Sequence, residues 1–376
     1  MKHYQVRMSG GRIGEGFNGR PPAFEPIALS TNGSTTTSQT GLSCPWPAPS
    51  TRVLVGWIDR LVGGGLNADR RGCPHLKDQL HQLLTRPVDT VVCTLLDESP
   101  EAPMNSALAH HDPAKLLAGI WLLGELTGAK NRWIVAEGGT PFRWLAEVRE
   151  GAAQLKLRMI WLRNDYPQSD PSVLLHTLLN RKLRPKRLPT EQGVLLLDAA
   201  AAIDIGQIAL CNKPVERTPL AFRDHTAGVS RFVTVPTGMK ISEALAAAGV
   251  ATEGKELRQG DLLRDLRIDG NATAGSGELV VHVNPREPAR SPDSCVRCGW
   301  CVEGCPTRIQ PAGLLEAAQR RNPDLADHYG LDSCIECGIC TYVCPSHLPI
   351  LDGIRQIRQQ SDELNKQLSG TVEKTG

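Results

Sequence analysis

Eight of the twelve cysteines in this 376-residue chain stand in two short runs with the same internal spacing. The first run reads SCVRCGWCVEGCP from Ser294, and the second reads CIECGICTYVCPSHLP from Cys334. Both contain C-x2-C-x2-C-x3-C-P, a spacing in which cysteine thiolates hold [4Fe–4S] clusters. The two runs therefore predict two such clusters, which would carry electrons one at a time.

The ligands of each cluster are expected to come from both runs. The first three cysteines of a run sit in one tight loop and can reach three irons of one cubane. The fourth cysteine, which precedes a proline, is carried away by the turn and ligates the other cluster. We therefore assign cluster I to Cys295, Cys298, Cys301 and Cys344, and cluster II to Cys334, Cys337, Cys340 and Cys305.

Zinc sites and disulfides are the structural alternatives for so many cysteines. Zinc sites usually pair two short C-x2-C hooks rather than two runs of four cysteines. Disulfides need an oxidising compartment, and the opening residues MKHYQVRMSGG lack the apolar core of an export signal. Iron–sulfur clusters also favour a reducing interior, so we expect the protein in the cytoplasm.

The composition excludes some classes of partner. A formal net charge of +2 gives no reason to expect nucleic-acid binding. The longest apolar stretches are interrupted by acidic residues before they reach the ~18 residues that a membrane span needs. We expect a protein in solution, or one held peripherally on the cytoplasmic face of a membrane by partner subunits.

The chain before the cysteine runs divides into regions with different patterns. Residues 1–50 are polar, proline-rich and poor in apolar periodicity, and predict an extended or disordered arm. Residues 51–215 alternate buried strands with helices, and two of the helices begin with the Asp-Pro pairs at Asp112 and Asp170. This β–α alternation predicts an α/β domain with a mostly parallel sheet.

The remaining regions are shorter. Residues 216–285 place the strand patterns RFVTVPTG and ELVVHVNP around one helix, ISEALAAAGV, and predict a small α+β module. Residues 286–355 contain the cysteine runs with a helical segment between them, and residues 356–376 read as a polar helical tail.

These regions together resemble the C subunit of the Rnf (Rsx) electron-transport complex. That family is related to the NADH-binding flavoprotein subunit of respiratory complex I. The resemblance rests on CIECGICTYVCPSHLP, on the segment from Asp165 to Leu220 and on RFVTVPTGMKISEAL. It implies a flavoprotein-like α/β domain, a β-grasp (SLBB) module and a helical dicluster domain of the ferredoxin type. The family's N-terminal barrel-like module has no counterpart in residues 1–50.

The resemblance also implies a flavin site, but the matching loops are altered. The family's glycine-rich G-x-G-F-P turn and following lysine become GGGLNADRRGCPHLKDQL, and the family's acidic loop becomes DESPE. The candidate FMN-binding residues that remain are Gly63, Gly64, Gly65, Lys77, Asp97 and Glu98. Three glycines are also typical of a plain tight turn, so the resemblance leaves FMN binding open.

The family's nicotinamide stretch is changed more strongly. YPQGGEKQL becomes YPQSDPSVL, in which Ser169, Asp170 and Pro171 replace two glycines and a glutamate. Glycine lets the backbone approach a phosphate closely, and Asp170 would add a negative charge near a pyrophosphate. Because Asp170-Pro171 also reads as an ordinary helix start, we expect that NADH binding has been lost.

Three functions are compatible with these patterns. The first is an iron–sulfur electron-transfer subunit that works with other subunits, including membrane-bound ones, and with a ferredoxin or flavoprotein as donor or acceptor. The second is an FMN-dependent NAD(P)H oxidoreductase that feeds its own clusters. The third is a scaffold that only docks partners. The altered YPQSDPSVL stretch favours the first, which has no catalytic substrate site of its own.

Overall fold

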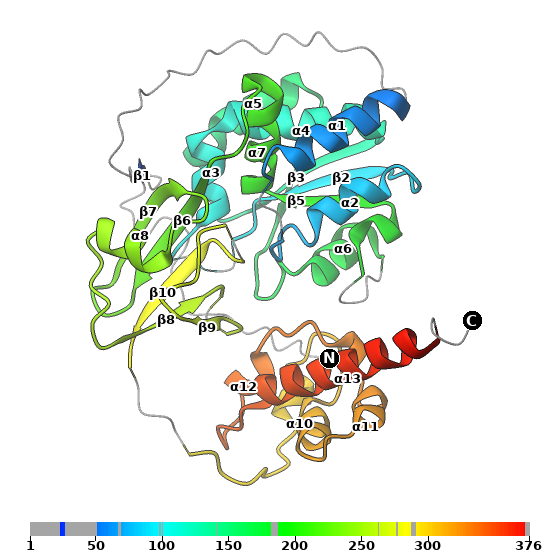
Figure 1. The fold of residues 1–376 in the computed structure, drawn as a ribbon, viewed down its shortest axis with the longest axis vertical. Coiled ribbons are helices and arrows are strands. Elements are labelled where there is room, and N and C mark those ends of the chain that lie inside the picture. The colour runs from blue at the N-terminus through cyan, green and yellow to red at the C-terminus, as the bar shows by residue number, and fades with distance from the viewer. Residues whose placement is uncertain are drawn as a thin grey trace. The chain divides into compact units, whose positions relative to one another are not determined.

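A computed structural model of the chain describes residues 23–26, 51–66, 69–97, 99, 101–140, 142–181, 187–261, 263–275, 277–286 and 291–372. Most of the expected arm, and Glu98 of the expected flavin site, lie outside these residues. The chain forms two compact units. The larger contains the described residues between 23 and 286, and the smaller contains the described residues between 291 and 372. Figure 1 labels the elements of both units.

A four-stranded parallel sheet lies at the centre of the α/β part of the larger unit. It contains β2 (Thr90–Thr94), β3 (Asn131–Glu137), β4 (Arg158–Leu162) and β5 (Val194–Asp198) in the order β4-β3-β2-β5. The first strand, β2, therefore has the next strand on one side and the last strand on the other. This reversal of order marks the place where open α/β sheets bind ligands, at the carboxyl ends of the strands.

Helices cover both faces of this sheet because its strands are apolar on both sides. Val91 and Cys93 of β2 face one core, to which α1 (Thr51–Gly63), α4 (Pro113–Thr127), α5 (Ala146–Gln154) and α7 (Ala199–Cys211) contribute (Figure 1). Val92 faces the other core, where it packs near Leu174 of α6 (Pro171–Leu179). The predicted mixed α/β class with a parallel sheet is confirmed.

The capping residues explain where several helices begin. Asp112 accepts a hydrogen bond from the backbone N–H of Lys115 at the start of α4, and Asp170 accepts one from Ser172 at the start of α6. The carboxylate of Asp198, at the end of β5, accepts one from Ala201 in α7. Each acid satisfies an N–H that would otherwise lack a partner.

The edge strand β5 is protected by a side chain of α2 (Leu76–Gln82). The fully buried Gln79 accepts a hydrogen bond from Leu196 N at 3.0 Å and donates one to Leu196 O at 3.1 Å. One side chain thus replaces the missing neighbour strand at this point. The short helix α3 (Met104–His111) follows β2, and the 3-10 turns η2 (Phe142–Leu145) and η3 (Pro189–Gln192) precede α5 and β5.

The second sheet of the larger unit has six strands in the order β1-β7-β6-β10-β8-β9. β6 and β7 form an antiparallel hairpin, and β10 returns parallel to β6. The single helix α8 (Ile241–Ala247) packs Ile241 and Leu245 against one face of this sheet. The strands are β1 (Phe24–Pro26), β6 (Arg217–Asp224), β7 (Val229–Pro236), β8 (Lys255–Gln259), β9 (Leu266–Ile268) and β10 (Val280–Pro285).

The smaller unit is helical and is built around the cysteine runs. Its core contains Leu314 of α10, Ala326 of α11 and Ile354 of α13. Its elements are α9 (Trp300–Glu303), α10 (Pro311–Gln319), α11 (Pro323–His328), η4 (Leu331–Ser333), α12 (Ile339–Tyr342) and α13 (Ile350–Val372).

Three features differ from the sequence-based expectation. Residues 24–26 of the expected arm form β1, which pairs in parallel with β7. The small module contains β6, β8 and β9 in addition to the two strands that were expected. The boundary expected between residues 355 and 356 falls inside a single helix, α13, which begins at Ile350. Ile357 and Arg358, in that expected tail, are buried.

Candidate iron–sulfur centres and sheet-edge crevice

The expected flavin residues that the structure describes do not gather at one place. Gly63 ends α1. Gly64 packs against α7, where a Cβ added to Gly64 would lie 2.7 Å from the Ile208 side chain. Gly65 has φ +82° and lies against the backbone of Val215. Lys77 is exposed on α2. Of these described candidates, only Asp97 lines the crevice at the carboxyl ends of the strands.

This crevice lies where the order of the parallel sheet reverses, at the ends of β2 and β5. Its volume is about 80 Å³, below the ~300–1,000 Å³ of typical ligand pockets. Asp198 and Arg70 occupy its wall as a buried ion pair, with Nε–Oδ2 and Nη2–Oδ1 distances of 2.8 and 2.9 Å. Burial alone would raise the pKa of Asp198, but the charge and hydrogen bonds of Arg70 hold that pKa below its usual range.

Asp97 is bound to the protein itself. Its carboxylate accepts hydrogen bonds from the backbone N–H groups of Asn105 and Ser106 and from the Ser106 hydroxyl. Burial raises the pKa of Asp97 to about 7, although these hydrogen bonds oppose that effect. This residue therefore stabilises the start of α3 at the rim of the crevice.

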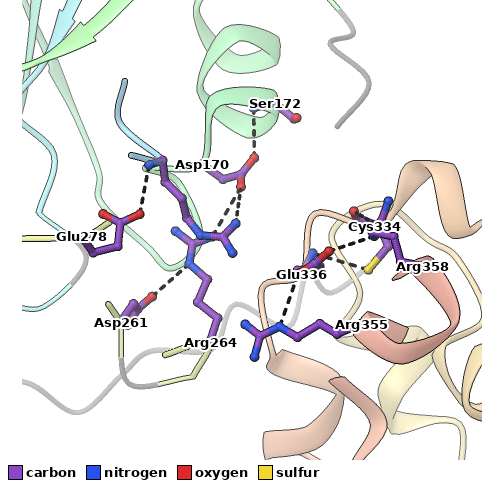
Figure 2. Close-up of polar contacts among 10 residues, drawn as sticks. Asp170, Ser172, Asp261, Arg264, Glu278, Cys334, Glu336, Arg355 and Arg358 are labelled. Carbon is purple, nitrogen blue, oxygen red and sulfur yellow. Dashed lines mark hydrogen bonds and ion pairs between the residues drawn. The ribbon is translucent and has the colours of Figure 1, made fainter. Parts of the chain in front are cut away.

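Asp170 joins the two halves of the larger unit beside the crevice (Figure 2). It is buried and forms ion pairs with Arg264 at 3.4 Å and with Arg71 at 3.8 Å. Arg264 also lies 3.5 Å from Asp261, and its guanidinium stacks 5.7 Å from the Tyr166 ring centroid. Burial raises the pKa of Asp170 to about 6, while Arg71 lowers it.

The residues at this edge do not fit a bound flavin. The arginines that could neutralise a phosphate are already paired with buried acids, and Gly63, Gly64 and Gly65, which the resemblance implied would cradle one, do not line the crevice. Sequence reasoning identified Asp170 and its capping role but missed Arg70, Arg264 and Asp198. The pairs Arg70–Asp198 and Arg264–Asp170 join residues that are distant in the sequence, so no local spacing indicates them.

The two cysteine runs adopt the same backbone shape. Arg297 and Glu336, the third residues of the two repeats, both have φ +53°. Gly299 and Gly338 follow with φ +81° and +76°, and they begin the short helices α9 and α12. Left-handed backbone is uncommon outside glycine, so its recurrence in the same place shows that the runs form equivalent loops.

One set of cysteines combines both runs. Cys305 of the first run lines a single cavity with Cys334, Cys337 and Cys340 of the second. All four are buried, among apolar side chains that include Ile339 and Ile354. Burial raises the pKa of the Cys340 thiol, and the neighbouring Cys337, Cys334 and Cys305 raise it further.

The fourth cysteine of the second run lies near the start of the first. The Ser346 hydroxyl donates to Ser294 O at 3.0 Å, and Asp293 N donates to Ser346 O at 3.0 Å. These bonds tie the turn that follows Cys344 to the residues that precede Cys295. Cys295 and Cys298 are exposed, whereas Cys301 and Cys344 are partly buried.

The donor set fits iron–sulfur clusters. Throughout the described parts of the chain, no three His, Cys, Asp or Glu side chains converge on a point suited to one metal ion. In a [4Fe–4S] cubane each cysteine thiolate binds a different iron, so the four cysteine sulfurs stay apart from one another. A backbone N–H group also donates a hydrogen bond to a cysteine sulfur: Glu336 N lies 3.4 Å from Cys334 Sγ. The eight cysteines named from the sequence would hold the clusters.

Residues 287–345 match the family model of the 4Fe–4S dicluster domain. A dicluster domain of this type is present. The match supports iron–sulfur binding by this part of the chain, in agreement with the predicted chemistry of the cysteine runs.

Curated relatives extend the comparison beyond the dicluster domain. The chain is 23% identical over 237 residues to the C subunit of the Na⁺-translocating ferredoxin:NAD⁺ oxidoreductase complex of Acetobacterium woodii, covering 62% of this chain and 54% of that protein. It is 22% identical over 246 residues to the C subunit of the ion-translocating oxidoreductase complex of Rhodobacter capsulatus, covering 61% and 47%. The predicted similarity to C subunits is confirmed.

A relative with a different name is equally similar. Cobalamin reductase of Salmonella typhimurium is 24% identical over 245 residues, covering 61% of this chain and 54% of that protein. The chain thus spans about half the length of the curated relatives it matches.

Solved structures agree with the fold. The NAD⁺-reducing [NiFe]-hydrogenase in its H₂-reduced state superposes with a TM-score of 0.56 at 13% identity, covering 87% of this chain and 67% of that chain. At such low identity the likeness concerns the fold alone. In the part of the chain that the structure describes, no helix combines the length and apolarity needed to cross a membrane.

The two sets of cysteines in the dicluster domain differ in their surroundings. Large apolar side chains around the first run and on α12 are exposed, among them Val296, Trp300 and Tyr342. The other set is buried instead, in a cavity that side chains of α13 also line. Its members are Cys305, Cys334, Cys337 and Cys340. The two sets of cysteines therefore differ in solvent access, which helps to set the potential of any cluster that they hold.

Proposed function

We propose that this chain is an iron–sulfur electron-transfer subunit of a multi-subunit redox complex, with two [4Fe–4S] clusters as a one-electron relay. The observation that carries the proposal is that Cys305 lines one cavity with three cysteines of the other run. Ligands exchanged between two runs bring two clusters into one small domain, which suits transfer between them.

The proposal also assigns four cysteine ligands to each cluster. Cluster I takes Cys295, Cys298, Cys301 and Cys344, and cluster II takes Cys334, Cys337, Cys340 and Cys305. The hydrogen bonds from Ser346 and Asp293 support the first set, and the shared cavity supports the second.

The electrons are proposed to come from a partner rather than from a nicotinamide bound by this chain. The crevice at the sheet edge is small, and Arg70 and Asp170 in and beside it are paired with protein groups. These contacts favour the relay over an FMN-dependent NAD(P)H oxidoreductase. The partners would be other subunits, including membrane-bound ones, and a ferredoxin or flavoprotein, with this subunit on the cytoplasmic side.

The small module is proposed to be a β-grasp (SLBB) module. Its strand order β7-β6-β10-β8-β9, with one helix after the first hairpin and the last strand parallel to the first, supports this. The module would position partners or the α/β part rather than bind a cofactor.

A set of cysteine variants tests the ligation proposal without any prior assignment of signals. In the reconstituted full chain, Cys305→Ser and Cys337→Ser should abolish or alter the same electron paramagnetic resonance signal. Cys344→Ser and Cys298→Ser should together alter the other signal. Cys211→Ser, which changes an exposed thiol outside the runs, is the control and should leave both signals intact.

One outcome of these variants would contradict the exchanged ligation. If Cys305→Ser and Cys298→Ser altered the same signal, each run would hold its own cluster and the exchanged ligation would be wrong.

A further inference from the structure

Two arginines of α13 reach back to the loop of the second cysteine run (Figure 2). Arg358 lies at the first cysteine of that run and donates from Nη2 to Cys334 O at 2.8 Å and to Leu331 O at 2.9 Å. Its Nε lies 2.8 Å from a carboxylate oxygen of Glu336. The guanidinium therefore holds the backbone of a cluster ligand and places a positive charge there.

The environment of this charge is buried. Arg358 is 8% exposed, and Ile354 and Ile357 beside it on α13 are fully buried. Arg355 contacts the same carboxylate at 3.3 Å but is 22% exposed in its side chain. Charges interact more strongly where water is excluded, so Arg358 should act on the cluster more than Arg355 does.

The two runs carry opposite charges at the equivalent loop position. Arg297 occupies this position in the first run and Glu336 in the second, with the same φ of +53°. Glu336 would place a negative charge beside a buried cluster, which disfavours reduction. Arg358 and Arg355 offset that charge through their ion pairs with Glu336.

We infer that Arg358 is a positioning residue for cluster II and raises its reduction potential relative to a loop without the cation. This inference rests on the proposed ligation of cluster II. Reduction adds one electron, supplied by the redox partner, and thus one negative charge to the cluster and its thiolates. A buried cation 2.8 Å from the carbonyl of a ligand residue stabilises that added charge.

The test is a redox titration of the reconstituted full chain, followed by electron paramagnetic resonance. Arg358→Gln should lower the potential of cluster II so that its reduced-to-oxidised ratio at a fixed potential falls at least tenfold, a shift of 59 mV for one electron. The potential of cluster I should stay unchanged. Arg355→Gln is the matched control, because it removes the same charge from the same helix at a more exposed position, and its shift should be smaller.

Two further variants separate charge from folding. Arg358→Lys keeps the charge, so the reduction potential of cluster II should stay close to that of the parent protein. Glu336→Gln removes the negative charge and should shift cluster II in the opposite direction, to higher potential. Iron content is measured for the parent chain and for each variant. Fewer than eight irons in the parent chain would count against the proposed function, whereas a loss in one variant alone distinguishes a missing cluster from an unshifted one.

Specific results would overturn the inference. An Arg358→Gln protein with full iron and an unshifted cluster II potential would do so, as would equal shifts of both clusters. If Arg358→Gln fails to hold cluster II, an unchanged or lowered potential in Glu336→Gln would also overturn it.

Discussion

Several charged residues buried in this protein are held by opposite charges or hydrogen bonds. Asp198 is held by Arg70, and Asp170 is held by Arg264 and Arg71. A buried charge without such partners would cost several kcal/mol. These contacts engage the arginines that could otherwise neutralise the phosphate of a nucleotide at the sheet edge.

A pair of neutral histidines is likewise held by hydrogen bonds. The fully buried His282 lies 2.8 Å from Gly260 O through Nε2 and 2.9 Å from His225 Nε2 through Nδ1. Because the carbonyl can only accept, Nε2 carries the proton and Nδ1 accepts from His225. Burial, together with the neighbouring His225, lowers the pKa of His282 to about 4.

This lowered pKa predicts a specific loss of stability in mild acid. The unfolded chain binds a proton on this histidine near pH 6.5, whereas the folded chain binds it only near pH 4. Stability is therefore lost as the pH falls from about 6.5 toward 4. Between pH 7 and pH 5 the parent protein should lose about 2 kcal/mol more unfolding free energy than His282→Gln.

Urea denaturation followed by tryptophan fluorescence at the two pH values measures this difference. His81→Gln replaces an exposed histidine of α2 and is the control, which should follow the parent protein. Parallel pH profiles for the parent and His282→Gln would show that the histidine pair has no such effect.

The residue scale also shows what the sequence can reveal. The eight cysteines could be identified because ligand spacing within a tight loop is a local property. Arg358 could not, because it lies in what reads as a polar tail and meets Cys334 only after α13 has folded. The pairs of Arg70 with Asp198 and of Arg264 with Asp170 escaped notice for the same reason, since the two partners of each pair lie far apart in the sequence.

At the scale of elements, the crossing of α4 and α7 requires two glycines. A Cβ on Gly206 would lie 1.9 Å from Lys115 O, and one on Gly119 would lie 2.0 Å from Ala202 O. The two backbones thus approach too closely for any side chain between them. This contact fixes α7, and with it Asp198, at the end of β5.

Gly206→Ala should therefore destabilise the protein even though alanine favours helices. We expect a loss of about 1–3 kcal/mol or more, because the helices must move apart. Gly56→Ala in α1 is the matched control, since a Cβ there meets nothing within 4 Å, and it should be neutral or stabilising by up to about 1 kcal/mol. Thermal or urea unfolding compares the two variants, and equal effects would contradict the close crossing.

Elements differ in how well the sequence predicts them. The alternation of strands and helices in residues 51–215 could be predicted because strands such as β2 and β5 are continuous apolar runs, buried along their whole length. β6 was missed because Pro219 and charged residues such as Arg217 and Arg223 interrupt its pattern. β8 was missed because it is half-buried throughout and reads KELRQ, and β1 because it gains its partner β7 only in the folded chain.

At the scale of the whole molecule, two compact units carry different parts of the account. The larger unit has the fold in which ligands bind at the sheet edge, but its own ion pairs occupy the crevice and the residues beside it. The smaller unit keeps all eight cysteines in two equivalent loops. The proposed role therefore lies in the smaller unit, and the larger unit would serve attachment to partners.

The most direct test of this account is a joint assay of iron and released flavin in the anaerobically reconstituted full chain. The account predicts eight irons for each chain, as two [4Fe–4S] clusters require, and no flavin released on denaturation. Four irons, or one flavin for each chain, would contradict it.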